Sequence, residues 1–399
     1  MDVAVVGGGY TGLAAARRLA RAGVGVAVLE AGPIGGGASS VNGGMTIVGL
    51  KPGLAELVRR HGEPLARRLW DASLASVDLV EKLVAEEGIE CHFRRDGAAA
   101  LGFNRRDRDR FTASAGWMDR HLGHQQELIP FERIHEVVGS DRCAAALVDR
   151  QSGGLHPARY VYGLARAAAR AGAILVEHSQ VHRLERREGA FRLETVRGAV
   201  RAGQVLLATN GYTGRLIPAL RRRVFPGGSY IVVTEPLPGD QAERLVPAGR
   251  MLWTARWFLN YFRLTPDRRL LMGGRNDLSV DLDLLESGRA LRRSILGFFP
   301  ELADVAVTHT WGGRLGITFD LMPHIGRLEG AWYALGYSGH GVALATYLGE
   351  EVAGLITGQT EASPFAEIPH PTHWWYRGRP WFLPGAAAWY RLLDGIRGS

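Results

Sequence analysis

Cysteine is nearly absent from this chain, since only Cys91 and Cys143 occur among its 399 residues. Two cysteines exclude a disulfide framework and any zinc or iron–sulfur site that needs four cysteine ligands. The sequence also has no run of about 18 apolar residues, so it indicates no membrane-spanning helix. An apolar segment follows Met1 and Asp2 without a basic leader, and we therefore expect no signal peptide. These absences favour a soluble cytoplasmic protein without stable membrane insertion.

Lysine is equally scarce, because Lys51 and Lys82 are the only lysines and arginine supplies the rest of the 48 basic residues. A mechanism that needs a Schiff base or a tuned amine is restricted to these two side chains, and we expect both on surface loops or helices. The net charge of +8 is spread over scattered arginine doublets. A nucleic-acid interface requires a contiguous basic stripe, so we expect no nucleic-acid partner.

Metal-ligand patterns are incomplete as well. His121 with His124, and His370 with His373, have a spacing that occurs in metal sites. No glutamate or cysteine completes a motif around either pair. We therefore interpret these histidines as surface or packed residues and expect no metal.

The size of the chain predicts two connected domains. Its 399 residues exceed the roughly 250 to 300 residues at which a single core stops growing. Its composition, 46% hydrophobic and 22% charged, is that of an ordinary globular protein.

The first thirty residues carry the clearest local signal. A strand, an alanine-rich helix and a second strand follow one another, which is a βαβ unit. Gly7, Gly9 and Gly12 have the spacing G-x-G-x-x-G between the first strand and the helix, which permits a tight turn and close approach to a pyrophosphate. Glu30 ends the second strand, where a carboxylate accepts hydrogen bonds from an adenosine ribose. The segment predicts a dinucleotide site with its phosphates at the helix N-terminus.

The identity of the dinucleotide follows from the rest of the chain. The combination of strand, G-x-G-x-x-G and helix does not recur after residue 40, so the site holds either NAD or an FAD that the substrate itself reduces. A second strand, turn and helix over residues 332–356 favours FAD. A helix N-terminus stabilises the negative charge at the N1/C2 region of a reduced flavin by ~0.3 to 2 kcal/mol, and NAD needs no such second pole.

Two further segments have a pattern that suits a binding site. Residues 31–45 are too rich in glycine for a helix or strand, so we expect a loop that brings backbone close to a ligand. Within residues 257–264, alternation places Tyr261 and Arg263 on one strand face and Phe262 on the other. Arg263 either lines a pocket beside Tyr261 or is an outer-face residue stacked on that ring.

Several of these motifs together resemble the D-amino-acid oxidase (DAO) type of FAD-dependent amine oxidoreductases, over nearly the whole chain. The matching segments are residues 5–13 with Glu30, 38–45, 207–212 and 336–341. Residues 229–237, 261–267 and 311–314 are most similar to the γ-glutamylputrescine oxidase branch.

The resemblance implies an α/β fold with two domains. A Rossmann-type FAD-binding domain, of the glutathione-reductase-like FAD fold, would comprise residues 1–50, 150–220 and 320–358. Residues 51–149 and 221–319 would be insertions that build a substrate domain of β-sheet and helices. Residues 359–399 would form an aromatic C-terminal strap.

The resemblance also implies which residues bind FAD. The ADP half would contact Gly7, Gly9, Tyr10, Thr11, Gly12, Glu30 and Ala31, with Val181 at the adenine and Thr209 and Asn210 in the nucleotide domain. The diphosphate, ribityl chain and ring would contact Ser39, Ser40, Asn42, Gly43, Gly44 and Met45. Near the ring would lie Gly313 and Arg314, and at its pyrimidine edge Gly339, His340, Gly341 and Val342. Some relatives attach the flavin covalently through a histidine near the position of Asn42 or a cysteine near Arg314. Neither residue type is present there, so we expect non-covalent FAD.

The implied reaction is oxidation of a C–N bond in a small amine or amino-acid-like substrate, with hydride transfer to flavin N5 and hydrolysis of the imine. Such a transfer depends on positioning more than on a dedicated acid or base. Arg263 would bind a substrate carboxylate or polarise the far side of the flavin, Tyr261 and Tyr230 would border the pocket, and Arg314 would lie near the ring.

The electron acceptor and the class of enzyme leave alternatives open. Several related oxidases place a lysine beside the flavin to promote reaction with O2, whereas Arg263 takes that neighbourhood here. Reoxidation by O2 would give H2O2, and a quinone or protein acceptor would instead make this an amino-acid or sarcosine-type dehydrogenase. A tRNA-modifying flavoenzyme and a non-catalytic NAD-binding regulator are further alternatives. We expect a monomer or a homodimer.

Overall fold

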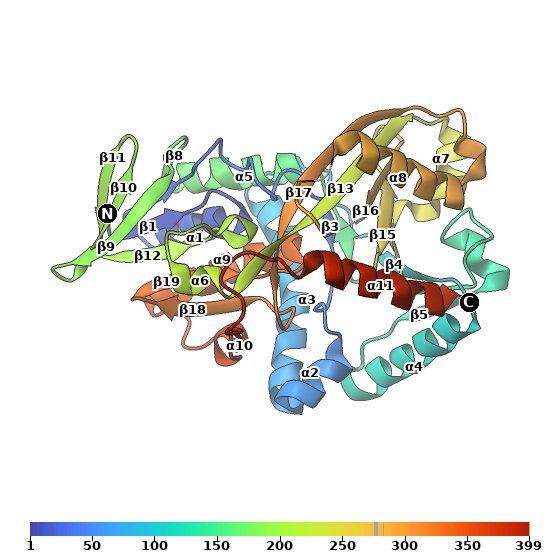
Figure 1. The fold of residues 1–399 in the computed structure, drawn as a ribbon, viewed down its shortest axis with the longest axis horizontal. Helices are drawn as coiled ribbons and strands as arrows, with labels where there is room; N and C mark the ends of the chain where they lie inside the picture. The colour runs from blue at the N-terminus through green and yellow to red at the C-terminus, as the bar shows by residue number, and fades with distance from the viewer. Residues whose placement is uncertain (275–277, 282, 399) are drawn as a thin grey trace.

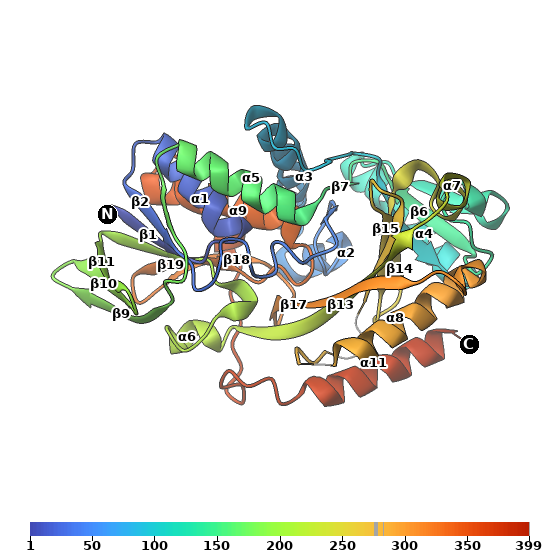
Figure 2. The same cartoon turned by 90° about the horizontal axis from the view of Figure 1, so that it is seen from above.

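The computed structural model describes residues 1–274, 278–281 and 283–398. Residues 275–277 and 282, which fall in the second predicted insertion, and residue 399 lie outside the described residues. The chain forms two lobes, each around one large sheet (Figures 1 and 2). Among the helices that the structure describes, none combines the length and apolar character that crossing a bilayer requires.

The first lobe contains a six-stranded sheet in the order β18-β19-β12-β1-β2-β8. β1 (Val3–Val6) pairs in parallel with β2 (Val26–Leu29) and β12 (Gln204–Leu207). Every residue of β1 and β2 is buried, as expected for parallel strands that are covered on both faces. The remaining strands are β8 (Ile174–Val176), β19 (Ala331–Leu335) and the antiparallel edge strand β18 (His324–Leu328).

Helices cover one face of this sheet and a small sheet covers the other, as Figure 2 shows. The helices are α1 (Tyr10–Arg21), α5 (Pro157–Arg170) and α9 (Gly341–Thr357). The small antiparallel sheet consists of β9 (Val181–Arg187), β10 (Ala190–Thr195) and β11 (Gly198–Ala202). The predicted βαβ unit and the later strand, turn and helix are therefore confirmed.

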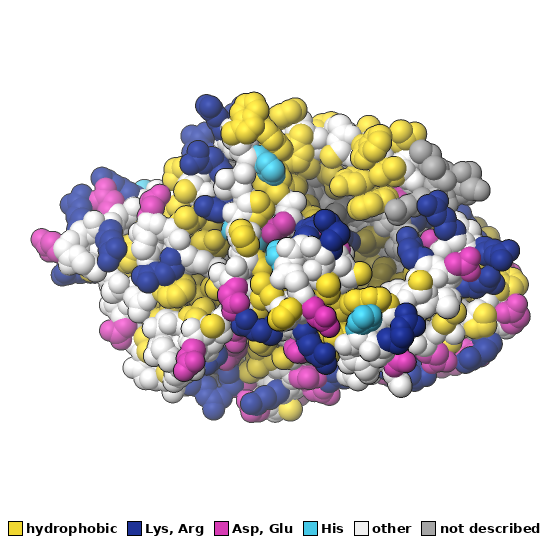
Figure 3. All heavy atoms as spheres, turned by 90° about the horizontal axis from the view of Figure 1, so that it is seen from below, with side chains coloured by type: hydrophobic (Ala, Val, Ile, Leu, Met, Phe, Trp, Pro, Cys, Tyr) yellow, Lys and Arg dark blue, Asp and Glu magenta, His cyan; other side chains and the backbone are white. Residues whose placement is uncertain are grey.

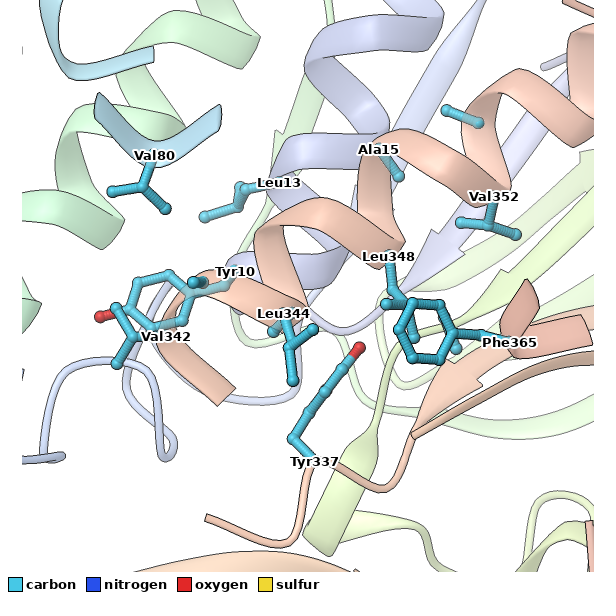
Figure 4. Close-up of a cluster of buried hydrophobic side chains, with 14 of the residues drawn as sticks. Tyr10, Leu13, Ala15, Val80, Tyr337, Val342, Leu344, Leu348, Val352 and Phe365 are labelled. Carbon is cyan, nitrogen blue, oxygen red and sulfur yellow. The ribbon is translucent and has the colours of Figure 1, made fainter. Parts of the chain in front are cut away.

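Helices α1 and α9 meet at the centre of the first lobe's core (Figure 4). Leu13 of α1 and Leu348 of α9 are fully buried there. Gly349 permits the close approach, because a Cβ at this position would meet the Thr11 carbonyl oxygen. The hydroxyl groups of Thr11 and Tyr337 lie 2.6 Å apart, which ties the start of α1 to the turn before α9.

Helices from the first predicted insertion also contribute to this core. α2 (Leu54–His61) and α3 (Glu63–Glu86) supply Leu57, Leu69 and Val80 to the buried cluster that holds α1 and α9. The strands of the same insertion lie in the second lobe.

The second lobe contains an eight-stranded sheet in the order β17-β13-β16-β15-β14-β4-β6-β5. Strands from the two predicted insertions join where β4 runs parallel to β14. Helix α8 covers one face, where Phe262 and Phe298 share a core. The bounds are β4 (Ala98–Gly102), β5 (Glu127–Pro130), β6 (Ala145–Asp149), β13 (Val224–Pro236), β14 (Met251–Thr254), β15 (Asn260–Leu264), β16 (Arg269–Gly274), β17 (Val307–Thr318) and α8 (Leu284–Phe298). The prediction of a two-domain α/β fold is confirmed.

Further helices, strands and turns complete the two lobes. They are β3 (Met45–Thr46), β7 (Gly153–Gly154), α4 (Arg105–Leu122), α6 (Pro218–Arg221), α7 (Gly239–Leu245), α10 (Pro364–Glu367) and α11 (Leu383–Gly398), with 3₁₀ turns at Phe131–Glu136, Asn210–Tyr212, Pro247–Gly249 and Pro300–Leu302.

The strand expected over residues 257–264 is shorter than its alternation suggests. β15 begins at Asn260, because residues 255–259 form the loop of the hairpin between β14 and β15. Tyr261 and Arg263 still share one face, and Phe262 lies on the opposite face in the core. Trp257 lies in this loop and is 42% exposed.

Candidate dinucleotide groove and substrate chamber

A cavity of about 910 Å³ is formed by residues of both lobes. The β1–α1 turn, the ends of β2 and β12 and the start of α9 provide one part of its wall. Strands β13, β14, β15 and β17 provide the other part. We call the first part the nucleotide groove and the second part the substrate chamber, with Ser229, Ile231, Trp253, Leu259 and Tyr261 as the chamber wall.

The glycine turn between β1 and α1 packs closely against neighbouring segments of the chain. Gly7 has φ +112°, and a Cβ there would lie 2.7 Å from the Ala208 carbonyl oxygen. A Cβ at Gly9 would lie 2.8 Å from Ser39 Oγ. The first turn of α1 has no acidic residue, and Tyr10 and Thr11 line the cavity. This helix N-terminus therefore presents its positive end to the groove, as a diphosphate requires.

Glu30 shapes the groove next to this turn. Its Oε2 accepts a hydrogen bond from Gly8 N at 2.6 Å, and its Oε1 accepts one from Gly32 N at 3.0 Å. A carboxylate has about four lone-pair sites, so acceptor capacity remains for ribose hydroxyls. Ala31 and Val181 line the same end of the cavity. These residues fit the adenosine half of a dinucleotide.

Asn42 braces the glycine-rich loop that crosses the cavity. Its Nδ2 donates to the carbonyl oxygens of Ala38 and Ser39, both at 3.0 Å, and its Oδ1 accepts from Gly44 N at 2.8 Å. Glycine is required at position 43, since a Cβ there would lie 2.5 Å from the ring of Tyr261. The loop is therefore packed directly against the chamber wall.

A second helix N-terminus opens onto the cavity at α9. Gly339, His340, Gly341 and Val342 line it, and the first turn of α9 has no acidic residue. Asn210 fixes the strand before this turn, because its Oδ1 accepts a hydrogen bond from Gly336 N at 3.0 Å. The positive end of α9 is the pole that we expected for the pyrimidine edge of a flavin.

Arg263 lies behind the loop and is not among the residues that line the cavity. Its guanidinium is buried and donates to the carbonyl oxygens of Gly43 at 2.8 Å and Leu155 at 3.1 Å. Burial lowers the pKa of Arg263 to about 10, so the group is protonated at neutral pH. Its contacts are those of a brace for the loop at Gly43.

Arg314 and Tyr230 were also expected near the site, and the structure brings only Arg314 to the cavity. Arg314 lines the cavity, lies 5.9 Å from the ring of Tyr212 and pairs with Asp281 at 3.4 Å. Tyr230 was expected to border the pocket, and this is wrong: its ring lies in the core on the α8 side, and its hydroxyl donates to the Ser279 carbonyl oxygen.

The cavity brings together most of the predicted site residues. Those that line it are Gly7, Gly9, Tyr10, Thr11, Glu30, Ala31, Ser39, Asn42, Gly43, Met45, Val181, Thr209, Asn210, Tyr261, Gly313, Arg314, Gly339, His340, Gly341 and Val342. Those that do not are Gly12, Ser40, Gly44 and Arg263. Gly12 supports the groove indirectly, because a Cβ there would meet the Gly7 carbonyl oxygen.

Lys51 is the main residue that the sequence analysis missed. We expected it on the surface, yet it lines the cavity together with Ile47 and Val48. The sequence did contain one indication that Lys51 lies near the cavity, because it follows the glycine-rich loop by only a few residues. Among the described lining residues Glu30 is the only acidic one, whereas Lys51, Arg215 and Arg314 are basic. The cavity as a whole is therefore suited to anionic groups.

Among the described residues, neither a metal-ligand cluster nor a thiol lines this cavity. Within residues 1–274, 278–281 and 283–398, no group of three or more His, Cys, Asp or Glu is arranged to hold a metal ion. Cys91 and Cys143 are fully buried away from the cavity, and burial raises the pKa of their thiols to about 11 and about 12.

The surface charge of the protein is mixed on the face shown in Figure 3, where basic and acidic side chains lie interspersed.

Comparisons with known proteins show what this chain is similar to. The family model described as "DAO: FAD dependent oxidoreductase" matches residues 2–355. The chain is 34% identical to "Gamma-glutamylputrescine oxidoreductase" of Escherichia coli, over 99% of this chain and 93% of that protein. It is 35% identical to "Probable oxidoreductase OrdL" of Rhizobium meliloti, over 98% and 92%. Glycine oxidase from Geobacillus kaustophilus has the same fold, with a TM-score of 0.78 at 24% identity over 93% of this chain and 99% of that one.

Proposed function

Because this chain belongs to the DAO family of FAD-dependent oxidoreductases, we propose that it oxidises a C–N bond of an amine that also carries a carboxylate. γ-Glutamylputrescine is the first candidate substrate, since a relative named for the oxidation or reduction of this compound aligns over nearly the full length of both chains. FAD is the cofactor, and the residues of the groove fit its ADP half and its ring.

The charge of the substrate chamber is the observation that carries the proposal. Its wall is mostly apolar and aromatic, from Ile231, Trp253, Leu259 and Tyr261. None of the described residues in this wall is acidic, and Lys51 and Arg314 supply positive charge to the cavity. A dication such as free putrescine would meet like charges there, whereas a carboxylate would find a partner.

Bound FAD supplies the two-electron acceptor for a hydride from the carbon next to the amine. The chain contributes position and environment. The apolar wall removes water from the amine and favours its neutral form, because burial disfavours a charged ammonium. The N-terminus of α9 provides positive potential at the same cavity.

Anaerobic reduction of the flavin tests this function directly. Purified protein loaded with FAD is mixed without oxygen with γ-glutamylputrescine, putrescine, sarcosine or D-alanine, and the loss of flavin absorbance is followed. We expect γ-glutamylputrescine to bleach the flavin fastest and putrescine to bleach it at least about tenfold more slowly. A tenfold ratio corresponds to a difference of about 1.4 kcal/mol in the free energy with which the site recognises the two amines. Admission of air should restore the absorbance with formation of H2O2. Slow recovery in air with fast recovery on addition of a quinone would instead favour a dehydrogenase.

Replacement of Lys51 tests the charge of the chamber. Lys51→Met should raise the KM for γ-glutamylputrescine about fivefold, because a partly exposed ion pair contributes about 1 kcal/mol. The matched control is Lys82→Met, which alters the other lysine, 66% exposed on α3 and 3.7 Å from Glu86. An equal KM for the Lys51 and Lys82 variants would exclude Lys51 as a contact of the substrate carboxylate.

A further inference from the structure

The C-terminal helix α11 lies outside the part of the chain that the family model matches, which ends at residue 355. In Figures 1 and 2 it runs along the outside of the lobe that holds the eight-stranded sheet. Its inner side is anchored by Leu383 and Ala387, which are buried in a cluster with Phe225, Ile317 and Tyr376. The outer side is solvent-exposed, with Trp389 57% exposed.

One carboxylate on α11 holds the hairpin loop of residues 255–259. Asp394 Oδ1 accepts a hydrogen bond from Trp257 N, and Asp394 Oδ2 accepts one from Phe258 N, both at 2.9 Å. Hydrogen bonds to an ionised acceptor are stronger than those between neutral groups. Both oxygens of this carboxylate thus secure consecutive backbone amides of a short loop.

Side chains of α11 reinforce the same attachment. The ring of Trp257 stacks on Tyr390 with centroids 4.9 Å apart and planes at 23°. The guanidinium of Arg391 lies 5.5 Å from the ring of Phe258. Consecutive residues of the loop are therefore held by the last turns of α11.

The next residue after this attachment, Leu259, lines the substrate chamber. The loop joins β14 to β15, and Trp253 and Tyr261, which pair across that hairpin, line the chamber as well. On the other side of the loop, Asn260 N donates to Thr254 Oγ1 at 2.9 Å. Leu259 thus lies between the point held by α11 and the start of β15.

We propose that α11 sets the shape of the substrate chamber, with Asp394 as the positioning residue that holds the 255–259 loop and thereby Leu259 against the substrate. The proposal rests on the proposed function for the identity of the substrate only. It predicts that loss of Asp394 frees the loop and weakens substrate binding, while FAD binding and the reaction of bound substrate are retained.

Hydrogen exchange of the full chain loaded with FAD, without any amine, tests the attachment. In Asp394→Ala, amide exchange in a peptide covering residues 255–260 should accelerate about tenfold or more, since two charge-assisted hydrogen bonds are lost. Asp394→Asn keeps one carbonyl acceptor and should give a smaller acceleration. The matched control is Trp389→Ala, which removes an exposed ring from the same helix and should leave this exchange within about twofold. Equal exchange in the native protein and Asp394→Ala would overturn the proposal.

Steady-state kinetics with γ-glutamylputrescine test the link to the chamber. Asp394→Ala should raise KM about threefold or more with kcat within about twofold, the pattern of lost ground-state binding. In a Leu259→Ala background, the same change should have less than half that effect, because the side chain that the loop positions is absent. Faster exchange with unchanged KM would overturn the role in the chamber. The exchange result stands apart from the proposed function, because it involves no substrate.

Discussion

Gly7→Ala should weaken FAD binding by about tenfold or more. Gly7 has φ +112°, a conformation that an L-residue adopts only under strain, and the new Cβ would lie 2.7 Å from the Ala208 carbonyl oxygen. Such strain costs about 1 to 3 kcal/mol. Without cofactor the turn can relax away from this conformation, so cofactor binding has to restore the strain and the affinity falls by that amount. FAD titrations monitored by flavin fluorescence measure the change.

Gly32→Ala is the matched control for this prediction. Gly32 lines the same groove, and a Cβ at that position would have nothing within 4 Å. It should leave the Kd for FAD within about twofold, as surface substitutions commonly do. Equal affinities for the two variants would show that the β1–α1 turn does not approach the diphosphate. Thermal melts of both proteins without FAD would show whether Gly7→Ala acts on folding itself.

The nucleotide groove could be predicted from the sequence because its determinants are local. Gly7, Gly9 and Glu30 lie within one βαβ unit, so the order of strand, turn and helix already brings them together. The α9 pole was also predictable, since a strand, a glycine turn and a helix again follow one another directly. In both cases the chemistry depends on backbone at the start of a helix, which leaves a clear trace in the spacing of glycines.

The substrate chamber was harder to predict because it is assembled across the two lobes. Strand alternation placed Tyr261 and Arg263 on one face of the strand, yet alternation cannot predict which of these side chains reaches the cavity. Tyr261 reaches the cavity, whereas the longer side chain of Arg263 passes behind the loop to the carbonyl oxygens of Gly43 and Leu155. The pairing of β13 with β17 decided the orientation of Tyr230, whose ring packs toward α8. Lys51 reaches the cavity through tertiary packing alone.

Arg263→Met should lower kcat/KM by about thirtyfold or more and should also destabilise the protein. In the native protein Arg263 is 7% exposed, and its guanidinium donates to the carbonyl oxygens of Gly43 and Leu155. Each buried carbonyl that loses its partner costs about 1 to 3 kcal/mol, and the Gly43 carbonyl belongs to the loop that packs on Tyr261. We expect the loop to shift away from its position against Tyr261, so that flavin affinity and the rate of flavin reduction fall together. Stopped-flow reduction and thermal melts measure both effects.

A conservative variant separates bracing from a direct electrostatic role. Arg263→Lys keeps a positive charge but loses the planar fork that reaches two carbonyl oxygens in different directions. If Arg263 acts as a brace, Arg263→Lys should lose most of the activity that Arg263→Met loses, and both variants should melt at lower temperature. If the charge itself polarises the flavin, Arg263→Lys should instead reduce flavin at close to the native rate. Arg244→Met, which removes an arginine that is 67% exposed on α7 and paired with Asp240, should change neither rate nor stability appreciably. A native-like kcat/KM in Arg263→Met would exclude both roles, because neither the loop nor the flavin would then depend on this side chain.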